Sequence, residues 1–321
     1  MSDLDDIFTP TSNWLKNKEK VALATVISTW GSAPRKVGGQ MAINNFGEII
    51  GSVSGGCVES SVITEAKTAI KDRKIKIKDY GISDEMAWEV GLACGGELKV
   101  LIQPLEYKDE IILKIAKKIS AREPITLIIN CKSGDRKIVE SDSLNFKKFS
   151  FLDKENEIFY QVVNPKPRLF VIGAGHISQS LVGMANITGY EVILIDPREH
   201  FANKKRFPEC KIINEWPDNA LENFNLNETS HIVTLTHDPK IDDPALVKVL
   251  NSKIGYVGSL GSKRTHEKRI NRLNSYGIDD EKLSKIHSPI GLDISSKTPE
   301  EISISILAEL TQFRRKINEK S

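Results

Sequence analysis

The chain has 321 residues, of which 40% are hydrophobic and 27% are charged, and 45 Lys and Arg residues nearly balance 43 Asp and Glu residues. This composition is typical of globular proteins, and it excludes overall disorder and a protein that mainly coats nucleic acid. Because no apolar stretch reaches the roughly 18 residues of a membrane span and the N-terminus is acidic, we expect a cytoplasmic protein without membrane or nucleic-acid partners.

The length predicts two domains, at roughly 100–200 residues each. We expect a mixed α+β domain over residues 1–106, a connector with edge strands of the first sheet over residues 107–164, and a Rossmann-like domain over residues 165–321. Pro165 and Pro167 mark the boundary, because two prolines in three residues continue neither a helix nor an inner strand. The expected fold class is therefore α/β.

The first half begins with an apolar strand over residues 21–27. Alternating runs separated by Asn and Gly then predict an antiparallel hairpin. After Cys57 the apolar residues of 58–70 recur at helical spacing. A glycine-rich turn over residues 91–96 leads into a further strand over residues 98–102.

The second half alternates short apolar runs with helical patterns, which predicts a doubly wound parallel sheet with helices on both faces. The expected strands are residues 169–172, 192–195, 211–213, 232–235 and 255–257. The last helix has the clearest start, because Thr298 as N-cap, Pro299 at the first position and Glu301 make a capping box.

The first strand of this half ends at a loop with the spacing G-x-G-x-x-G/A, formed by Gly173 and Gly175 with Ser178 in the last slot. Glycines there let backbone amides approach a phosphate at the start of the following helix. Asp196 ends the second strand, where an acid accepts ribose hydroxyls. We predict that Gly173, Gly175, His176 and Asp196 bind NAD or another nucleotide, with an empty structural loop as the alternative.

More polar residues follow the later strands. His237 and Asp238 come directly after the strand at 232–235, and we assign His237 to the same ligand. The loop over residues 258–264 resembles an anion-holding loop but lacks the spacing of an ATP-binding loop. The alternatives are helix caps for Asp238 and Asp243 and a solvated basic face for Lys263 and Arg264.

The four cysteines lie far apart, which excludes a disulfide framework and a zinc ribbon. Cys131 and Cys210 end ordinary strands and are expected to be buried hydrophobes. Cys57 follows Gly55 and Gly56 at a junction of strand and helix, where the positive helix end and unpaired amides favour the thiolate. Since a soft thiolate suits a persulfide or a transition metal such as molybdenum or copper, Cys57 is the candidate reactive and metal-binding residue.

Three further positions extend this candidate site. Glu59 is a candidate catalytic proton acceptor, or alternatively a first-turn acid that favours the helix dipole. Cys94, followed by Gly95 and Gly96, repeats the glycine turn and is the second candidate catalytic cysteine. Arg35 supplies a counter-charge for an anionic ligand.

Four motifs occur in order along the chain: GSVSGGCVE at 51–59, CGGE at 94–97, GAGH at 173–176 and HSPIGLD at 287–293. With these motifs the chain resembles the XdhC/CoxI family of xanthine dehydrogenase accessory proteins over nearly its whole length. The resemblance implies a chaperone that binds molybdenum cofactor (molybdopterin), protects it while a sulfido ligand replaces an oxo ligand, and delivers it to a xanthine dehydrogenase-type molybdenum hydroxylase. It also implies a cysteine desulfurase as partner and self-association, which we expect to give a homodimer.

The resemblance assigns the family's cofactor-linked cysteine to Cys57. It assigns the second cysteine to Cys94, where Ala93 replaces the more usual glycine. We expect the anionic end of the pterin to be held by Arg35 and the glycine turns, namely Gly55, Gly56, Gly95 and Gly96.

Two alternatives come from different functional classes. An NAD-dependent oxidoreductase would use the Gly173 loop, Asp196 and His237 as an acid or base, but the sequence has no Tyr-x-x-x-Lys pair of the short-chain dehydrogenase type. A docking scaffold would leave the Rossmann-like half empty. We expect a maturation chaperone and not a turnover enzyme.

Overall fold

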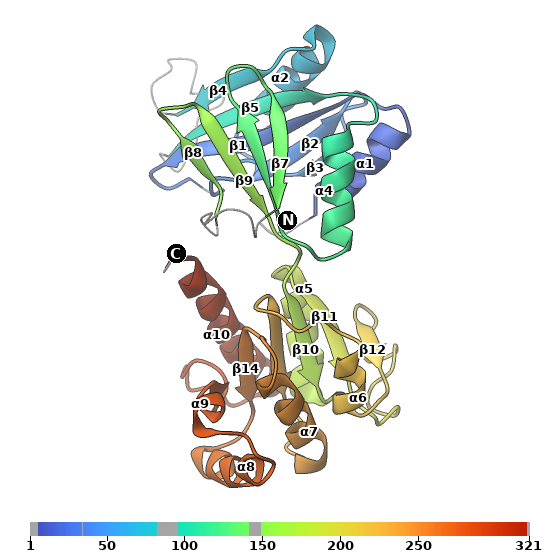
Figure 1. The fold of residues 1–321 in the computed structure, drawn as a ribbon, viewed down its shortest axis with the longest axis vertical. Helices are drawn as coiled ribbons and strands as arrows, with labels where there is room; N and C mark the ends of the chain where they lie inside the picture. Colours follow the sequence, from blue (N-terminus) through green and yellow to red (C-terminus); the bar gives the residue numbers. More distant parts are fainter. Residues whose placement is uncertain (1–5, 34, 82–95, 141–148, 320–321) are drawn as a thin grey trace. The chain divides into compact units, whose positions relative to one another are not determined.

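The computed structural model describes the whole chain apart from residues 1–5, 34, 82–95, 141–148 and 320–321. The chain divides into two compact units, one ending at Pro165 and the other beginning at Lys166 (Figure 1). Within the described ranges, none of the helices is both long enough and apolar enough to cross a membrane.

The first unit is built on a five-stranded antiparallel sheet with the order β3-β2-β1-β5-β4. Its strands are β1 (Val21–Trp30), β2 (Gln40–Asn44), β3 (Ile49–Gly51), β4 (Lys76–Tyr80) and β5 (Glu97–Leu105). Helix α2 (Glu59–Asp72) covers one face, because Val62, Ala66 and Ala69 repeat at helical spacing and pack against the strands.

The other face packs against α1 (Phe8–Lys16), α4 (Glu110–Ser120) and a second sheet in one shared core. This sheet has the order β7-β6-β9-β8 and consists of β6 (Ile125–Asn130), β7 (Arg136–Glu140), β8 (Phe151–Asp153) and β9 (Ile158–Val163). The expectation of edge strands of the first sheet over residues 107–164 is therefore wrong. Both edges of the central strand β6 are paired with strands from the same residues 107–164, namely β7 and β9.

The second unit holds a six-stranded sheet with the order β12-β11-β10-β13-β14-β15, in which every pair is parallel. The strands are β10 (Arg168–Ile172), β11 (Glu191–Ile195), β12 (Lys211–Ile213), β13 (Ser230–Thr234), β14 (Tyr256–Ser259) and β15 (Ile286–His287). The order reverses between β10 and β13, which is the arrangement of a doubly wound fold and confirms the predicted fold class.

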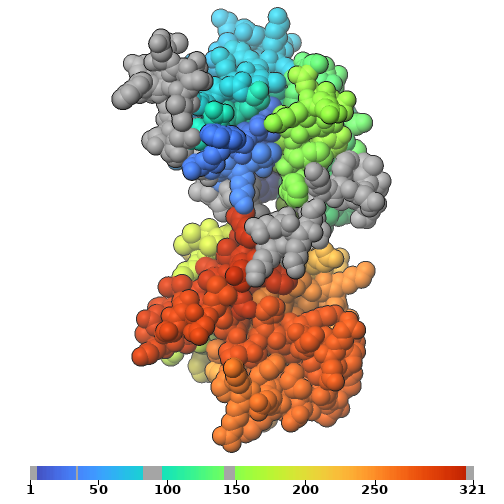
Figure 2. All heavy atoms as spheres, turned by 90° about the vertical axis from the view of Figure 1, so that its left-hand side faces the viewer, coloured from blue at the N-terminus to red at the C-terminus, as the bar shows by residue number. Residues whose placement is uncertain are grey.

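Helices cover both faces of this sheet, because successive side chains of β10 point to opposite faces and are buried on both. Leu169 and Val171 pack with α5 (His176–Ile187) and α10 (Pro299–Glu319), whereas Phe170 and Ile172 pack on the opposite side. That side is covered by α6 (Pro217–Glu222), α7 (Pro239–Leu250) and α8 (Lys263–Ser275). Figure 2 shows α8 and the short α9 (Asp280–Leu283) in orange, and α10 in red, at the surface of the unit.

The start of α10 confirms the predicted capping box. The Glu301 backbone N–H donates to Thr298 Oγ1 at 3.3 Å, and the Thr298 N–H donates to Glu301 Oε2 at 3.0 Å. Two orphan donors of the helix end are thereby satisfied.

Candidate functional sites

Cys57 lies exposed in the loop between β3 and α2, with a free thiol. The two residues before it have left-handed backbones, with φ of +79° at Gly55 and +125° at Gly56. No atom lies within 4 Å of the place where a Cβ on Gly56 would be. The glycine pair therefore gives this loop a backbone that other residues rarely adopt, and the space at Gly56, directly before Cys57, is open.

The carboxylate of Glu59, at the start of α2, organises the loop. It accepts hydrogen bonds from the Ser52 hydroxyl at 2.6 Å and from the Ser54 hydroxyl. The backbone N–H groups of Ser54, Gly55 and Gly56 donate to it at 2.9, 3.0 and 2.8 Å. Partial burial raises the pKa of Glu59, but the hydrogen bonds from Ser52 and Ser54 outweigh burial and lower it to about 2.

These bonds correct the expectation of unpaired amides before Cys57. The amides of residues 54–56 are satisfied by Glu59, and the Val58 N–H donates to Ser54 Oγ at 2.9 Å. A carboxylate with five donors and a pKa of about 2 is a poor proton acceptor at neutral pH. The geometry favours the alternative, in which Glu59 shapes the loop that carries the thiol.

Two further predicted residues, Arg35 and Gly96, lie in the segments that follow β1 and precede β5. Arg35 is half-buried in the loop between β1 and β2. Gly96 precedes β5, and a Cβ there would lie 2.8 Å from the backbone nitrogen of Ala33, so these two segments are in contact. Ala33, Val53 and Val58 pack against one cluster, which brings the loops after β1 and β3 over the same core.

Cys94 and Gly95 lie outside the described residues. In the part of the chain that the structure describes, no three His, Cys, Asp or Glu side chains are grouped to hold a metal ion.

In the second unit, the glycine loop connects β10 to α5 at the point where the strand order reverses. Gly173 has a φ of +100°, and a Cβ on it would lie 2.3 Å from Thr236 Cγ2. Gly175 is the N-cap of α5 with open space around it, and His176 is the exposed first residue of the helix. The Ser178 hydroxyl donates to the Gly173 carbonyl at 2.5 Å, so the serine in the last slot ties the loop to the helix.

The predicted ribose acceptor, Asp196, is fully buried and already bonded. It accepts the Ala174 N–H at 2.8 Å and two hydrogen bonds from the Arg198 guanidinium, at 2.9 and 2.8 Å. Burial raises the pKa of Asp196, and the hydrogen bonds from Arg198 outweigh it and lower the pKa below the usual value. A ribose would have to displace Arg198 to reach this carboxylate.

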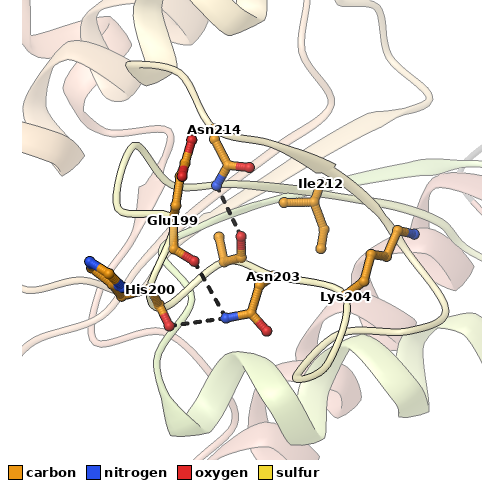
Figure 3. Close-up of a pocket in the computed structure, with 7 residues that line it drawn as sticks. Glu199, His200, Asn203, Lys204, Ile212 and Asn214 are labelled. Carbon is orange, nitrogen blue, oxygen red and sulfur yellow. Dashed lines mark hydrogen bonds between the residues drawn. The ribbon is translucent and has the colours of Figure 1, made fainter.

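The loop that follows Asp196 lines a hollow of about 540 Å³ beside β12 (Figure 3). The Asn203 side-chain amide donates to the His200 carbonyl at 3.0 Å, and the Asn214 amide donates to the Ala202 carbonyl at 3.0 Å. Lys204 Nζ donates to the Cys210 carbonyl at 2.7 Å. The polar groups of this hollow thus hold the loop together.

A second cavity, also of about 540 Å³, lies where α7 and α8 begin. His237 lines it with a φ of +62°, together with Pro239, Asp242, Arg264, Thr265, Lys268, Arg269 and Arg272. Sequence reasoning did not single out the basic residues beyond Arg264 as part of a site. The signal was present, since positions 264, 268 and 272 share one face of a helix. Asp238 caps α7 by accepting the Lys240 N–H at 3.0 Å, as its structural alternative predicted.

The HSPIGLD motif joins the end of the sheet to α10. His287 Nδ1 lies 2.7 Å from Glu309 Oε1, and the Gly291 N–H donates to the other carboxylate oxygen at 2.5 Å. The motif therefore has a structural role in this unit.

Comparison with known proteins covers both units. A family model described as the XdhC Rossmann domain matches residues 169–310, and one described as the XdhC and CoxI family matches residues 14–81. A Bacillus subtilis (strain 168) protein, described as a probable xanthine dehydrogenase subunit, is 28% identical across 94% of this chain and 96% of that protein. The molybdenum cofactor insertion chaperone PaoD of Escherichia coli (strain K12) is 26% identical, across 94% of this chain and 85% of that protein.

A solved structure agrees with the sequence comparison. The crystal structure of a protein described as a xanthine dehydrogenase from Bacillus halodurans matches with a TM-score of 0.80 and 27% identity. The match covers 98% of this chain and 96% of that one. The similarity therefore extends over both units.

Proposed function

Because the chain belongs to the XdhC and CoxI family, we propose that it is a molybdenum cofactor chaperone that assists cofactor insertion into a xanthine dehydrogenase-type molybdenum hydroxylase. The names of two relatives, a cofactor insertion chaperone and a probable xanthine dehydrogenase subunit, support this role. The structural observation that carries the proposal is the exposed thiol of Cys57 on a loop already held in shape.

The chain's own residues supply what such cargo needs. The thiolate of Cys57 is a soft ligand that suits molybdenum. Gly55 and Gly56 remove side chains that would block a bulky planar group. Glu59 fixes the loop before the cargo arrives, which reduces the conformational entropy lost on binding.

We extend the proposal to further residues of the first unit, to the sulfur donor and to the oligomeric state. Arg35 and the Gly96 turn hold the anionic end of the pterin, and Cys94 is the second catalytic cysteine. A cysteine desulfurase supplies the sulfur that replaces an oxo ligand while the cofactor is held, and the working form is a homodimer. The NAD-dependent oxidoreductase is not proposed, because Arg198 and Ala174 already occupy the carboxylate that a ribose would need.

Reconstitution tests this function. Cofactor-loaded protein is mixed with a cofactor-free xanthine dehydrogenase-type hydroxylase, and the recovered hydroxylase activity is measured for wild type, Cys57→Ala and Cys210→Ala. Wild type and Cys210→Ala should restore activity, because Cys210 is a buried thiol of the other unit. Cys57→Ala should restore little. Failure of the wild type to activate any client beyond free cofactor would refute the chaperone role.

A further inference from the structure

We propose that the cavity between α7 and α8 binds a phosphate-bearing small molecule. The cavity lies beyond the carboxyl ends of β13 and β14, where ligands of open α/β sheets bind. Its volume of about 540 Å³ falls in the range of small-molecule sites. The inference is independent of the Cys57 loop, which belongs to the other unit.

The charge of the cavity favours an anion. It is lined by four cationic side chains of α8: Arg264, Lys268, Arg269 and Arg272. Arg272 is neutralised by Asp243, with Nε 2.5 Å from Oδ2. Among the described residues, no acidic side chain forms an ion pair with Arg264 or Lys268, and Asp242 is the carboxylate that lines the cavity. Positive charge therefore remains in excess on a concave wall.

Arg269 provides a second, independent observation. Its side chain lines the cavity, yet the residue is only 2% exposed, and its Nε has no hydrogen-bond partner. The other nitrogens donate to neutral groups, Nη2 to the Leu260 carbonyl at 2.7 Å and Nη1 to Ser288 Oγ at 3.2 Å. Burial lowers the pKa of Arg269, and its attraction to Asp242 and Asp243 offsets the burial only in part. An anionic ligand beside the guanidinium would offset the remaining cost of burying this cation.

The surrounding geometry selects phosphate among anions. Both α7 and α8 begin at the cavity. Asp238 and Asp242 offset the positive end of the α7 dipole, whereas α8 has no acid in its first turn and presents its positive end there. Helix N-termini combined with guanidinium groups are the usual recognition elements for phosphate. A compact cavity fits one or two phosphate groups better than an extended acidic peptide, which needs a longer groove.

Calorimetric titration with inorganic pyrophosphate at low ionic strength tests the site. Wild type should bind with a dissociation constant below about 1 mM, and Arg264→Ala and Lys268→Ala should each weaken binding at least about fivefold. Lys263→Ala is the matched control, because Lys263 is an exposed cation of the same helix outside the cavity lining. Asp242→Asn should tighten binding, since it removes the opposing carboxylate.

The outcomes separate the sources of the phosphate group. Tighter binding of ADP than of pyrophosphate would identify a nucleotide, and equal affinity would identify a phosphate ester whose organic part lies outside the cavity. No heat from wild type up to about 5 mM pyrophosphate, or equal weakening by Lys263→Ala, would overturn the proposal. So would binding of a glutamate-rich peptide without binding of pyrophosphate. Cys57→Ala should leave the pyrophosphate affinity unchanged, which keeps this test separate from the chaperone proposal.

Discussion

At the scale of single residues, the loop before α2 depends on two side chains with different tasks. Cys57 presents its sulfur to solvent, and Glu59 holds the preceding loop in place through its carboxylate. Two residues in the same short segment thus provide the reactive thiol and the hydrogen bonds that hold its loop. The first role predicts the reactivity of the thiol, and the second predicts the stability of the unit.

Cys57 should react far faster than the other described thiols. Cys131 and Cys210 are each 5% exposed, and burial raises the pKa of both thiols. In a Cys94→Ser background, the native protein should show one thiol that reacts with an aromatic disulfide reagent at least about tenfold faster than the rest. Adding Cys57→Ala should remove this fast phase, and its persistence would show that another thiol is the accessible one.

Replacement of Glu59 by Gln should destabilise the first unit. The amide keeps one acceptor oxygen but turns an N–H₂ toward the loop donors, and because the site is only partly buried we expect a loss of about 1–2 kcal/mol at pH 7. The folded pKa of about 2 lies below the usual 4.5, so wild type holds this advantage above pH 4.5 and loses it as the pH falls toward 2. Urea unfolding at pH 7 and pH 3 measures both effects. A difference that does not shrink at pH 3 would contradict the charged role of Glu59.

Replacement of Asp242 by Asn should stabilise the second unit, in contrast to the destabilising Glu59→Gln. Burial raises the pKa of Asp242 to about 6. The hydrogen bonds with Thr236 and the charge of Arg269 lower this pKa, and the charge of Asp243 raises it, but burial dominates. Since the folded pKa exceeds the unfolded one, ionisation above pH 6 opposes folding. The variant should be more stable than wild type by about 1–3 kcal/mol at pH 8, and the gap should close below about pH 4. Urea unfolding across this range would refute the account if the gap stayed constant.

At the scale of elements, the turn between β10 and α5 is constrained by its neighbours. Gly173 combines a positive φ with close approach to Thr236 at the first residues after β13. Two neighbouring strands of the sheet therefore fix the shape of this loop, independently of any nucleotide. The proximity of Thr236 explains why a glycine is needed even if the loop is empty.

Gly173→Ala should destabilise the second unit by at least about 2 kcal/mol, because the new Cβ would be strained by its φ and would overlap Thr236 Cγ2. Gly175→Ala is the matched control in the same loop, with nothing within 4 Å of the added Cβ and an ordinary φ of −75°. It should change stability by less than about 1 kcal/mol. Comparable losses in the two variants, measured by thermal unfolding, would show that the contact with Thr236 is not decisive.

The elements that sequence predicted well are those with strong local patterns. The five strands expected in the second half all appear, because a buried parallel strand reads as a continuous apolar run. The cap of α10 was readable from Thr298 and Glu301 for the same local reason. Pattern alone was therefore enough to predict the fold class of this unit.

The elements that the sequence did not predict lack a strong local pattern. The side chains of the edge strand β4 are mostly exposed, so its sequence shows only weak alternation of apolar and polar residues. Helix α1 has Pro10 in its first turn, which weakens the helical pattern of its sequence. The strands β6 to β9 were placed on the wrong sheet, since a sequence does not state which strand a strand pairs with. The role of Glu59 was undecided for a similar reason, because its five donors lie in a loop whose shape depends on two left-handed glycines.

At the scale of the whole molecule, each unit has its own candidate site with different chemistry. The first unit offers a soft sulfur ligand, and the second offers a cationic cavity. This separation means that a variant in one unit should leave the other site intact. The proposed function depends mainly on the first of these sites.

Cofactor retention by Cys57→Ala tests the central claim most directly. Wild type, Cys57→Ala and Cys210→Ala are purified from cells that make molybdenum cofactor, and pterin released from each is quantified by its fluorescence after oxidation. Wild type and Cys210→Ala should retain pterin, and Cys57→Ala should retain at least about tenfold less, the equivalent of about 1.4 kcal/mol of lost binding free energy. Equal retention by Cys57→Ala and wild type, or no pterin in any of the three, would contradict the account.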